Sequence, residues 1–315
     1  MPLGVAQTRG LMWLRRLYGL TWLYDTWTAS SSATHHALAA FLGLSVASVA
    51  VHLAGTGVLL VDLYIALALL LGKSMRLVLW VGLVYLLVLW ILVEHGGDFD
   101  PLAGGTDIGL SPPYILMLIF VCAGWRIRTA QATHGDIAVG HYWIGAVRVM
   151  FGFVWAWDAM FKLRPHFLTH FTTYLVVPDA MSGVPARGAS MAGMSMARMA
   201  RQPGWVVAWL HGWVGFIDAT SPLAFGIATA VIEVAIAYGL LTGRWLRIVL
   251  PLGLIFSLLI WVTAEGFGGP FGNGTTGMPG NMFGTAIIYA FLFAGLMVFY
   301  HWPRVVLPAV QSSTH

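Results

Sequence analysis

The most informative residues of this chain are charged side chains that interrupt long apolar segments. Asp158 and Lys162 stand four positions apart in the segment 142–163, and Glu233 lies within the apolar run 221–243. A charge inside a hydrophobic layer is costly, so it usually faces another charge, a cavity or a bundle interior. An acid four residues before a lysine is also the favourable order for an ion pair on a helix. We therefore expect these three side chains to form either an anion-binding site or a clamp between helices.

More basic residues surround this group. At 100° per residue, Arg148 falls on the same helical stripe as Asp158 and Lys162. Three further basic or titratable residues follow Lys162 where the apolar run ends, namely Arg164, His166 and His170. Such a cluster suits the binding of a small anion. The alternative is the ordinary basic flanking of a membrane helix.

Two glycine-rich loops each begin on a glutamate at the end of an apolar run. Glu94 opens the segment 93–109, and Glu265 opens the related segment 264–280. A carboxylate at such a boundary can exchange protons, or it can accept hydrogen bonds from the turning backbone. Neither loop has the spacing of a phosphate-binding glycine loop, so a nucleotide site is not expected here.

A methionine-rich segment, 181–202, suggests a metal. Thioethers on an outward-facing loop suit Cu(I), whereas an amphipathic surface helix with adaptable methionine packing is the alternative. The copper ligands in the first case would be Met191, Met194, Met196 and Met199. A b-type haem receives little support, because no histidines lie at matching depth on neighbouring apolar runs and no CxxCH motif occurs.

The composition identifies the elements that must position these residues. Of 315 residues, 59% are hydrophobic and only 9% are charged, whereas soluble domains carry about 25% charged residues. The runs 77–93 and 248–264 carry no charge over a length that can cross a bilayer. The net charge of +4 comes from residues at helix ends, so membrane topology explains it better than nucleic acid does. The single Cys122 excludes an internal disulfide.

An internal repeat organises the apolar runs. Segment 61–79 aligns with 232–250 at a constant offset of 171, and segment 15–25 aligns with 148–158 at an offset of 133. The difference places an insertion of 38 residues in the second copy, which includes segment 181–202. We predict an all-α integral membrane protein with eight transmembrane helices, arranged as two parallel-repeat four-helix bundles. The expected helices are 11–28, 47–72, 76–93, 111–126, 142–163, 221–243, 246–264 and 283–302.

This repeat predicts both domains and orientation. The first four-helix copy occupies 1–128, a cytoplasmic linker 129–141 follows, and the second copy occupies 142–315. Basic residues then gather on one side, which the positive-inside rule makes cytoplasmic. We expect both termini to lie on the cytoplasmic side of a prokaryotic inner membrane, with the glycine-rich loops and the methionine-rich segment outside.

Three stretches resemble the DoxX/DoxD superfamily of four-helix membrane modules. They are RVMFGFVWAWDAMFKL (148–163), VIEVAIAYGLLTGRWLR (231–247) and EGFGGPFGNGTTGMPG (265–280). The resemblance covers 142–302 well and 11–126 more faintly. The chain departs from a plain family member by its duplication, by its methionine-rich insertion, and by Ala29 at the position that corresponds to Lys162.

The DoxD branch implies the large membrane subunit of a thiosulfate:quinone oxidoreductase with a small companion subunit. Thiosulfate would be oxidised to tetrathionate outside and electrons would pass to membrane quinone, which some of the tryptophans could bind. The resemblance implies functional roles for Arg148, Lys162, Glu233 and Glu265, with Lys162 and Arg164 holding the anion and Glu265 handling protons. Two alternatives remain: a non-enzymatic accessory or assembly subunit of a larger respiratory or copper-containing complex, and a small-solute transporter.

Overall fold

A computed structural model describes residues 3–29, 39, 42–94, 96–97, 108–169, 171–175, 203–267 and 284–300, and these residues form helices without any strand. The first half contains α1 (Val5–Ala29), α3 (Val49–Leu71), α4 (Met75–Val88) with its π-helical continuation η1 (Leu89–Val93), and α5 (Ser111–Ala132). The second half contains α6 (Ala138–Lys162), α7 (Pro165–Thr169), the 3₁₀ turn η2 (Phe171–Tyr174), α8 (Gly204–Thr220), α9 (Pro222–Thr242), α10 (Leu246–Val262) and α11 (Thr285–Tyr300).

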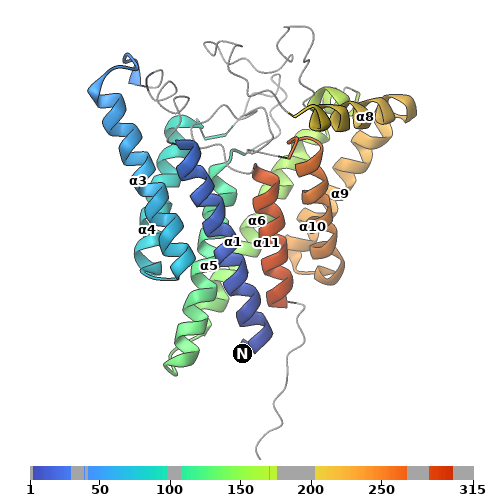
Figure 1. Ribbon diagram of the computed structural model, residues 1–315. Coiled ribbons are helices and arrows are strands. Elements are labelled where there is room, and N and C mark those ends of the chain that lie inside the picture. The colour runs from blue at the N-terminus through green and yellow to red at the C-terminus, as the bar shows by residue number, and fades with distance from the viewer. Residues whose placement is uncertain are drawn as a thin grey trace, which may run out of the picture.

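The long helices stand side by side and alternate in direction, with the N-terminus at the lower end of Figure 1. Helix α1 packs most extensively on α3, and α6 packs most extensively on α9. Helix α4 packs on α5, and α10 packs on α11. Contacts of α5 with α6 and α11, and of α1 with α11, join the two halves. The centre of the bundle is therefore formed by helices from both halves, α1 and α5 from the first and α6 and α11 from the second. Helices α3, α4, α9 and α10 lie at the two sides.

Two turns at the lower end have nearly the same backbone. Helices α3 and α9 both end on a glycine in the left-handed region, Gly72 with φ 70° and Gly243 with φ 71°. Glycine is favoured there because it has no Cβ to clash. Two residues later, Ser74 and Trp245 have φ 53° and 52° and begin the next helices. The chain thus reverses direction in the same way at both places.

Close helix contacts also recur in the two halves. A Cβ on Gly19 of α1 would lie 3.1 Å from the backbone nitrogen of Leu70, and a Cβ on Gly152 of α6 would lie 3.0 Å from that of Leu241. Both distances are tighter than ordinary van der Waals contact. The missing side chain consequently lets each helix approach its neighbour's backbone.

The apolar helices make this an all-α membrane protein. Within the described ranges, five helices are long and apolar enough to cross a bilayer, namely Val49–Leu71, Met75–Leu92, Ser111–Ala132, Ala138–Lys162 and Pro222–Thr242. Two shorter apolar helices, Leu246–Val262 and Thr285–Tyr300, accompany them. Large apolar side chains such as Leu53 and Ile255 point outward and are 68% and 66% exposed, as expected for a surface that faces lipid. Helix α1 is less apolar because it contains three arginines and an aspartate.

The observed helices agree closely with the eight expected ranges, but α7, η2 and α8 were not predicted. Helix α8 lies across the upper end of the bundle, crosswise to the long helices (Figure 1). The Trp209 indole nitrogen donates a hydrogen bond to the Val262 carbonyl at the end of α10, 2.9 Å away. Trp205 and Phe216 of α8 are more than half exposed. An apolar helix with exposed aromatic residues in this position suits a membrane interface.

Candidate functional site

A buried ion pair joins α6 to α9 in the second half. The Lys162 ammonium lies 2.7 Å from Oε1 of Glu233, and the two side chains are 13% and 0% exposed. Lys162 is the last residue of α6, where the negative end of the helix dipole favours a cation. Glu233 lies midway along α9, so the carboxylate is enclosed on all sides while the ammonium reaches the edge of the core. The expected contact between these two residues is therefore present.

Asp158 and Arg148 occupy different parts of the same helix. Asp158 lies one turn before Lys162 and is 5% exposed, so a second buried acid accompanies the ion pair. Arg148 lies near the lower end, where its guanidinium covers Gly243. The fourteen positions between Arg148 and Lys162 correspond to about 21 Å along a helix. The structure consequently separates Arg148 from the site, although both residues share a stripe.

Basic side chains continue beyond Lys162. The Arg164 guanidinium lies over the ring of Phe161, 4.5 Å from its centroid. His166 is exposed on the short helix α7, and α7 packs on α9 where Leu168 meets Gly226. These contacts place Lys162, Arg164 and His166 in succession at the exit from α6. His170 lies outside the described residues.

Glu265 and Glu94 bind the starts of the last helices of the two halves. Glu265 accepts a hydrogen bond from the Ala286 backbone N–H at the start of α11, with a length of 3.0 Å. Glu94 accepts hydrogen bonds from the Ser111 N–H at 3.2 Å and from the Ser111 hydroxyl at 2.7 Å, at the start of α5. A carboxylate at a helix N-terminus satisfies free N–H groups and complements the dipole. Of the two roles that the sequence left open for these acids, the contacts show the backbone-binding one.

A tryptophan forms the centre of an aromatic cluster in each half. Trp22 and Trp155 are 0% and 1% exposed, so they belong to the core and not to an interfacial belt. Ring centroids around Trp22 lie at 6.2 Å for Tyr18, 6.1 Å for Tyr85 and 6.0 Å for Tyr114, and those around Trp155 lie at 6.2 Å for Phe151, 6.0 Å for Phe256 and 5.3 Å for Tyr289. Tyr18 and Tyr85 thus supply hydroxyls where the second half has phenylalanine.

The first half also contains two buried acids, Asp25 and Asp62. The repeat aligns them with Asp158 and Glu233, but the sequence did not lead us to expect a site there. Asp25 and Asp62 are 0% and 2% exposed and lie within electrostatic reach of each other. The Tyr85 hydroxyl lies close enough to the Asp62 carboxylate to interact with it. The sequence contains a signal for this contact. At the offset of 171, Asp62 aligns with another acid, Glu233, whereas Tyr85 aligns with Phe256, which has no hydroxyl.

An open, shallow recess lies along one face of α1. It has a volume of about 460 Å³ and is lined by Leu20, Leu23, Tyr24, Thr26 and Trp27. The Tyr24 and Trp27 rings meet edge to face with centroids 6.3 Å apart, and Trp27 is 75% exposed. Apolar and aromatic side chains with few polar groups are typical of pockets for flat organic molecules. This part of α1 thus presents an apolar and aromatic surface.

Neither a metal cluster nor a known relative provides further guidance. Among the described residues, no group of three or more His, Cys, Asp or Glu could hold a metal ion. The methionines proposed for copper, Met191, Met194, Met196 and Met199, lie outside the described residues. Comparison with protein-family models, with curated proteins and with solved structures found no match. The function is consequently argued from the site itself.

Proposed function

We propose that this protein is a membrane subunit of a quinone-linked oxidoreductase that oxidises thiosulfate. Two thiosulfate ions each give up one electron and join through a new S–S bond to form tetrathionate. A quinone takes up the two electrons and two protons to become a quinol. The observation that supports this proposal most directly is the Lys162–Glu233 pair, with Arg164 and His166 beyond it.

The basic exit from α6 is where an anion would bind. A doubly charged anion that approaches from the upper end meets His166 and Arg164 before it reaches Lys162. The Lys162 ammonium can turn toward the anion because it lies at the edge of the core and retains some exposure. Its attraction to the anion is strengthened by the apolar surroundings. Glu265, at the same end of the second half, is the residue we assign to uptake of the protons that quinone reduction consumes.

The recess lined by Tyr24 and Trp27 is where we place the quinone, which supplies the electron-accepting chemistry. These residues bind and orient the ring. The Tyr24 hydroxyl is the group that we expect to donate a hydrogen bond to a quinone oxygen. The recess and the anion site are formed by different halves. Electron transfer between them therefore requires a companion subunit with a redox group, which we include in the proposal.

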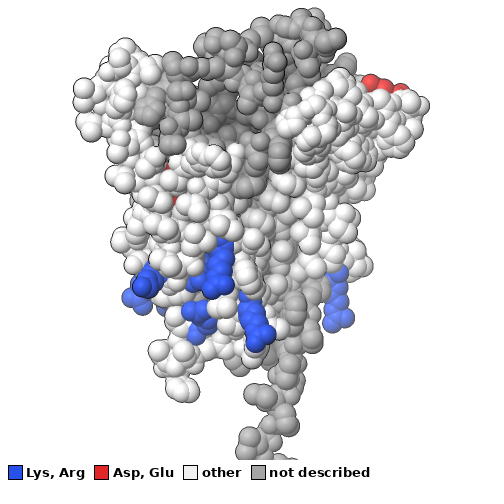
Figure 2. Space-filling model, in the orientation of Figure 1, with Lys and Arg blue, Asp and Glu red and all other residues white. Residues whose placement is uncertain are grey.

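We also propose the arrangement in the membrane. All eight long helices cross the bilayer, and the two halves are parallel copies related by an axis between α5 and α11. Lys and Arg side chains form a band at the lower end of the face in Figure 2, the end at which the N-terminus lies. The positive-inside rule makes this end cytoplasmic in a prokaryotic inner membrane. The anion site then opens on the outer side.

The test is thiosulfate-dependent reduction of a water-soluble quinone analogue by the purified protein, with and without co-purified subunits. We expect turnover, and we expect Lys162→Met to abolish most of it. Lys73→Met is the matched control, because Lys73 is the only other lysine of the chain and lies at the opposite end. Absence of turnover in both preparations would exclude this function. Since Lys162→Met leaves Glu233 unpaired, the double variant Lys162→Met/Glu233→Gln repeats the measurement without that buried charge.

A second function has one observation in its favour. Glu233 is bound by Lys162, and Glu94 and Glu265 are bound to helix starts. Acids used in this way hold helices together and need no reaction. If the protein shows no turnover and co-purifies with a respiratory complex, it is an accessory or assembly subunit of that complex.

A further inference from the structure

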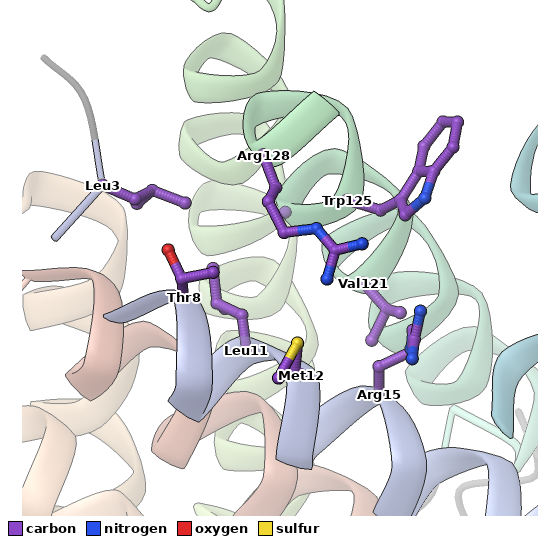
Figure 3. Close-up of a pocket in the computed structure, with 9 residues that line it drawn as sticks. Leu3, Thr8, Leu11, Met12, Arg15, Val121, Trp125 and Arg128 are labelled. Atoms are coloured by element: carbon purple, nitrogen blue, oxygen red, sulfur yellow. The ribbon is translucent and has the colours of Figure 1, made fainter. Parts of the chain in front are cut away.

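Two arginines converge on a small recess between α1 and α5, far from the site described above. The recess lies toward the lower end, and its lining residues are shown in Figure 3. Arg15 comes from α1 and Arg128 comes from the last turns of α5, and both guanidiniums point toward the space between the helices. The lining is Leu3, Thr8, Leu11, Met12, Arg15, Val121, Gly124, Trp125 and Arg128. We name this set the basic recess.

The electrostatics of the basic recess favour an anion. Arg15 is only 7% exposed, and its Nε is buried without a hydrogen-bond partner in the described part of the chain. Its terminal nitrogen makes one long hydrogen bond, 3.4 Å, to the Leu70 carbonyl. Arg128 and Arg16 lie close enough for their charges to act on Arg15. The described lining residues include no carboxylate, so two like charges face one space without a counter-ion from that part of the chain.

The dimensions and the lining define the kind of anion. The enclosed volume is about 20 Å³, which accommodates one water-sized group. A single phosphate oxygen fits inside, while the rest of the anion remains at the mouth. Leu11, Met12 and Val121 provide an apolar wall beside the guanidiniums. Arginine forms forked hydrogen bonds with phosphate, and an apolar wall suits an acyl chain.

We propose that the basic recess binds the phosphate of an anionic phospholipid at the basic end of the helices. Basic pockets between membrane helices on the cytoplasmic side are typical binding sites for such headgroups. Arg148 of the second half covers Gly243 just as Arg15 covers Gly72. The basic recess itself is formed by α1 and α5, which both belong to the first half.

The test uses the full-length protein in detergent, stripped of lipid and titrated with phosphatidylglycerol, with bound lipid counted by native mass spectrometry. Phosphatidylcholine and inorganic phosphate are the comparison ligands. We expect phosphatidylglycerol to bind more tightly than phosphatidylcholine, and Arg128→Gln to weaken it about fivefold. Arg126→Gln removes the same charge from an exposed position of the same helix and should leave binding unchanged.

Three outcomes would overturn the proposal. Equal losses for Arg126→Gln and Arg128→Gln would show diffuse attraction to a basic surface. Equal binding of the two phospholipids would show that the negative headgroup is not recognised. Complete displacement of the lipid by excess inorganic phosphate would identify a soluble phosphate as the ligand. If Arg128→Gln does not fold, Arg128→Lys retains the charge but not the fork, and it should also weaken phosphatidylglycerol binding while Arg126→Lys does not.

Discussion

The two halves of the molecule enclose an acid at the same place on equivalent helices but compensate it differently. Asp62 of α3 and Glu233 of α9 are both almost completely buried. The Tyr85 hydroxyl lies beside Asp62, whereas the Lys162 ammonium forms an ion pair with Glu233. The second half has Phe256 where the first has Tyr85, and the first has Ala29 where the second has Lys162. The two halves thus have the same helix arrangement, but the buried acid has a neutral partner in the first half and a charged partner in the second.

This difference bears on where function resides. An incoming anion can separate a buried carboxylate from its cation, because the anion can replace the carboxylate as the partner of that cation. A buried acid with a phenol has no mobile cation to offer an anion. The comparison therefore favours the second half as the place of the proposed thiosulfate site. The aromatic clusters around Trp22 and Trp155 are shared and point to a common structural role.

The largest effect should come from breaking the charged pair. We expect Lys162→Met to lower the free energy of unfolding by about 3–5 kcal/mol, because it leaves the Glu233 carboxylate buried without its partner. The double variant Lys162→Met/Glu233→Gln should recover most of this loss. Unfolding of the protein in mixed micelles with increasing denaturing detergent measures both. If the single and double variants lose the same stability, the pair is not the source of the effect.

The neutral partner should matter less. We expect Tyr85→Phe, which installs the residue of the second half, to lower the free energy of unfolding by about 1–3 kcal/mol, the cost of leaving a buried polar group without a partner. Tyr142→Phe is the control, since Tyr142 is 71% exposed. The same unfolding assay applies. A loss for Tyr85→Phe no larger than that for Tyr142→Phe would show that Asp62 does not depend on the hydroxyl, and the contrast between the halves would fail.

The positions of most helices could be predicted from the sequence, because they depend on local patterns or on the internal repeat. The long apolar runs fix where helices can lie, and the observed α3, α4, α9 and α10 begin and end within a few residues of the expected positions. The glycines at 72 and 243 stop two helices by a backbone conformation that depends on little else. The rule that charges inside apolar runs face one another also grouped Lys162 with Glu233.

Other parts depend on contacts that a linear pattern does not contain. Helix α8 has an apolar sequence, yet it lies across the bundle and hydrogen-bonds to the end of α10 through Trp209. The stripe that contains Arg148 and Lys162 is correct as a stripe, but its length separates the two residues. Which tryptophans are enclosed and which face outward follows from helix packing, so Trp22 and Trp27 could not be distinguished by position alone. The basic recess likewise arises from two helices that are distant in sequence.

The smallest expected effect tests what the halves share. Glu94→Gln and Glu265→Gln each remove the charge that complements the start of α5 or α11, and we expect each to lower the free energy of unfolding by about 0.3–1 kcal/mol. Asp218→Asn, an exposed acid of α8, is the control and should have no effect. Unfolding assays measure the stability, and quinone reduction by the same variants measures function. Equal losses of stability with unchanged turnover would make both glutamates helix caps only and remove Glu265 from the reaction. Loss of turnover for Glu265→Gln alone would show that the second half uses for proton transfer a carboxylate that the first half uses only to bind a helix.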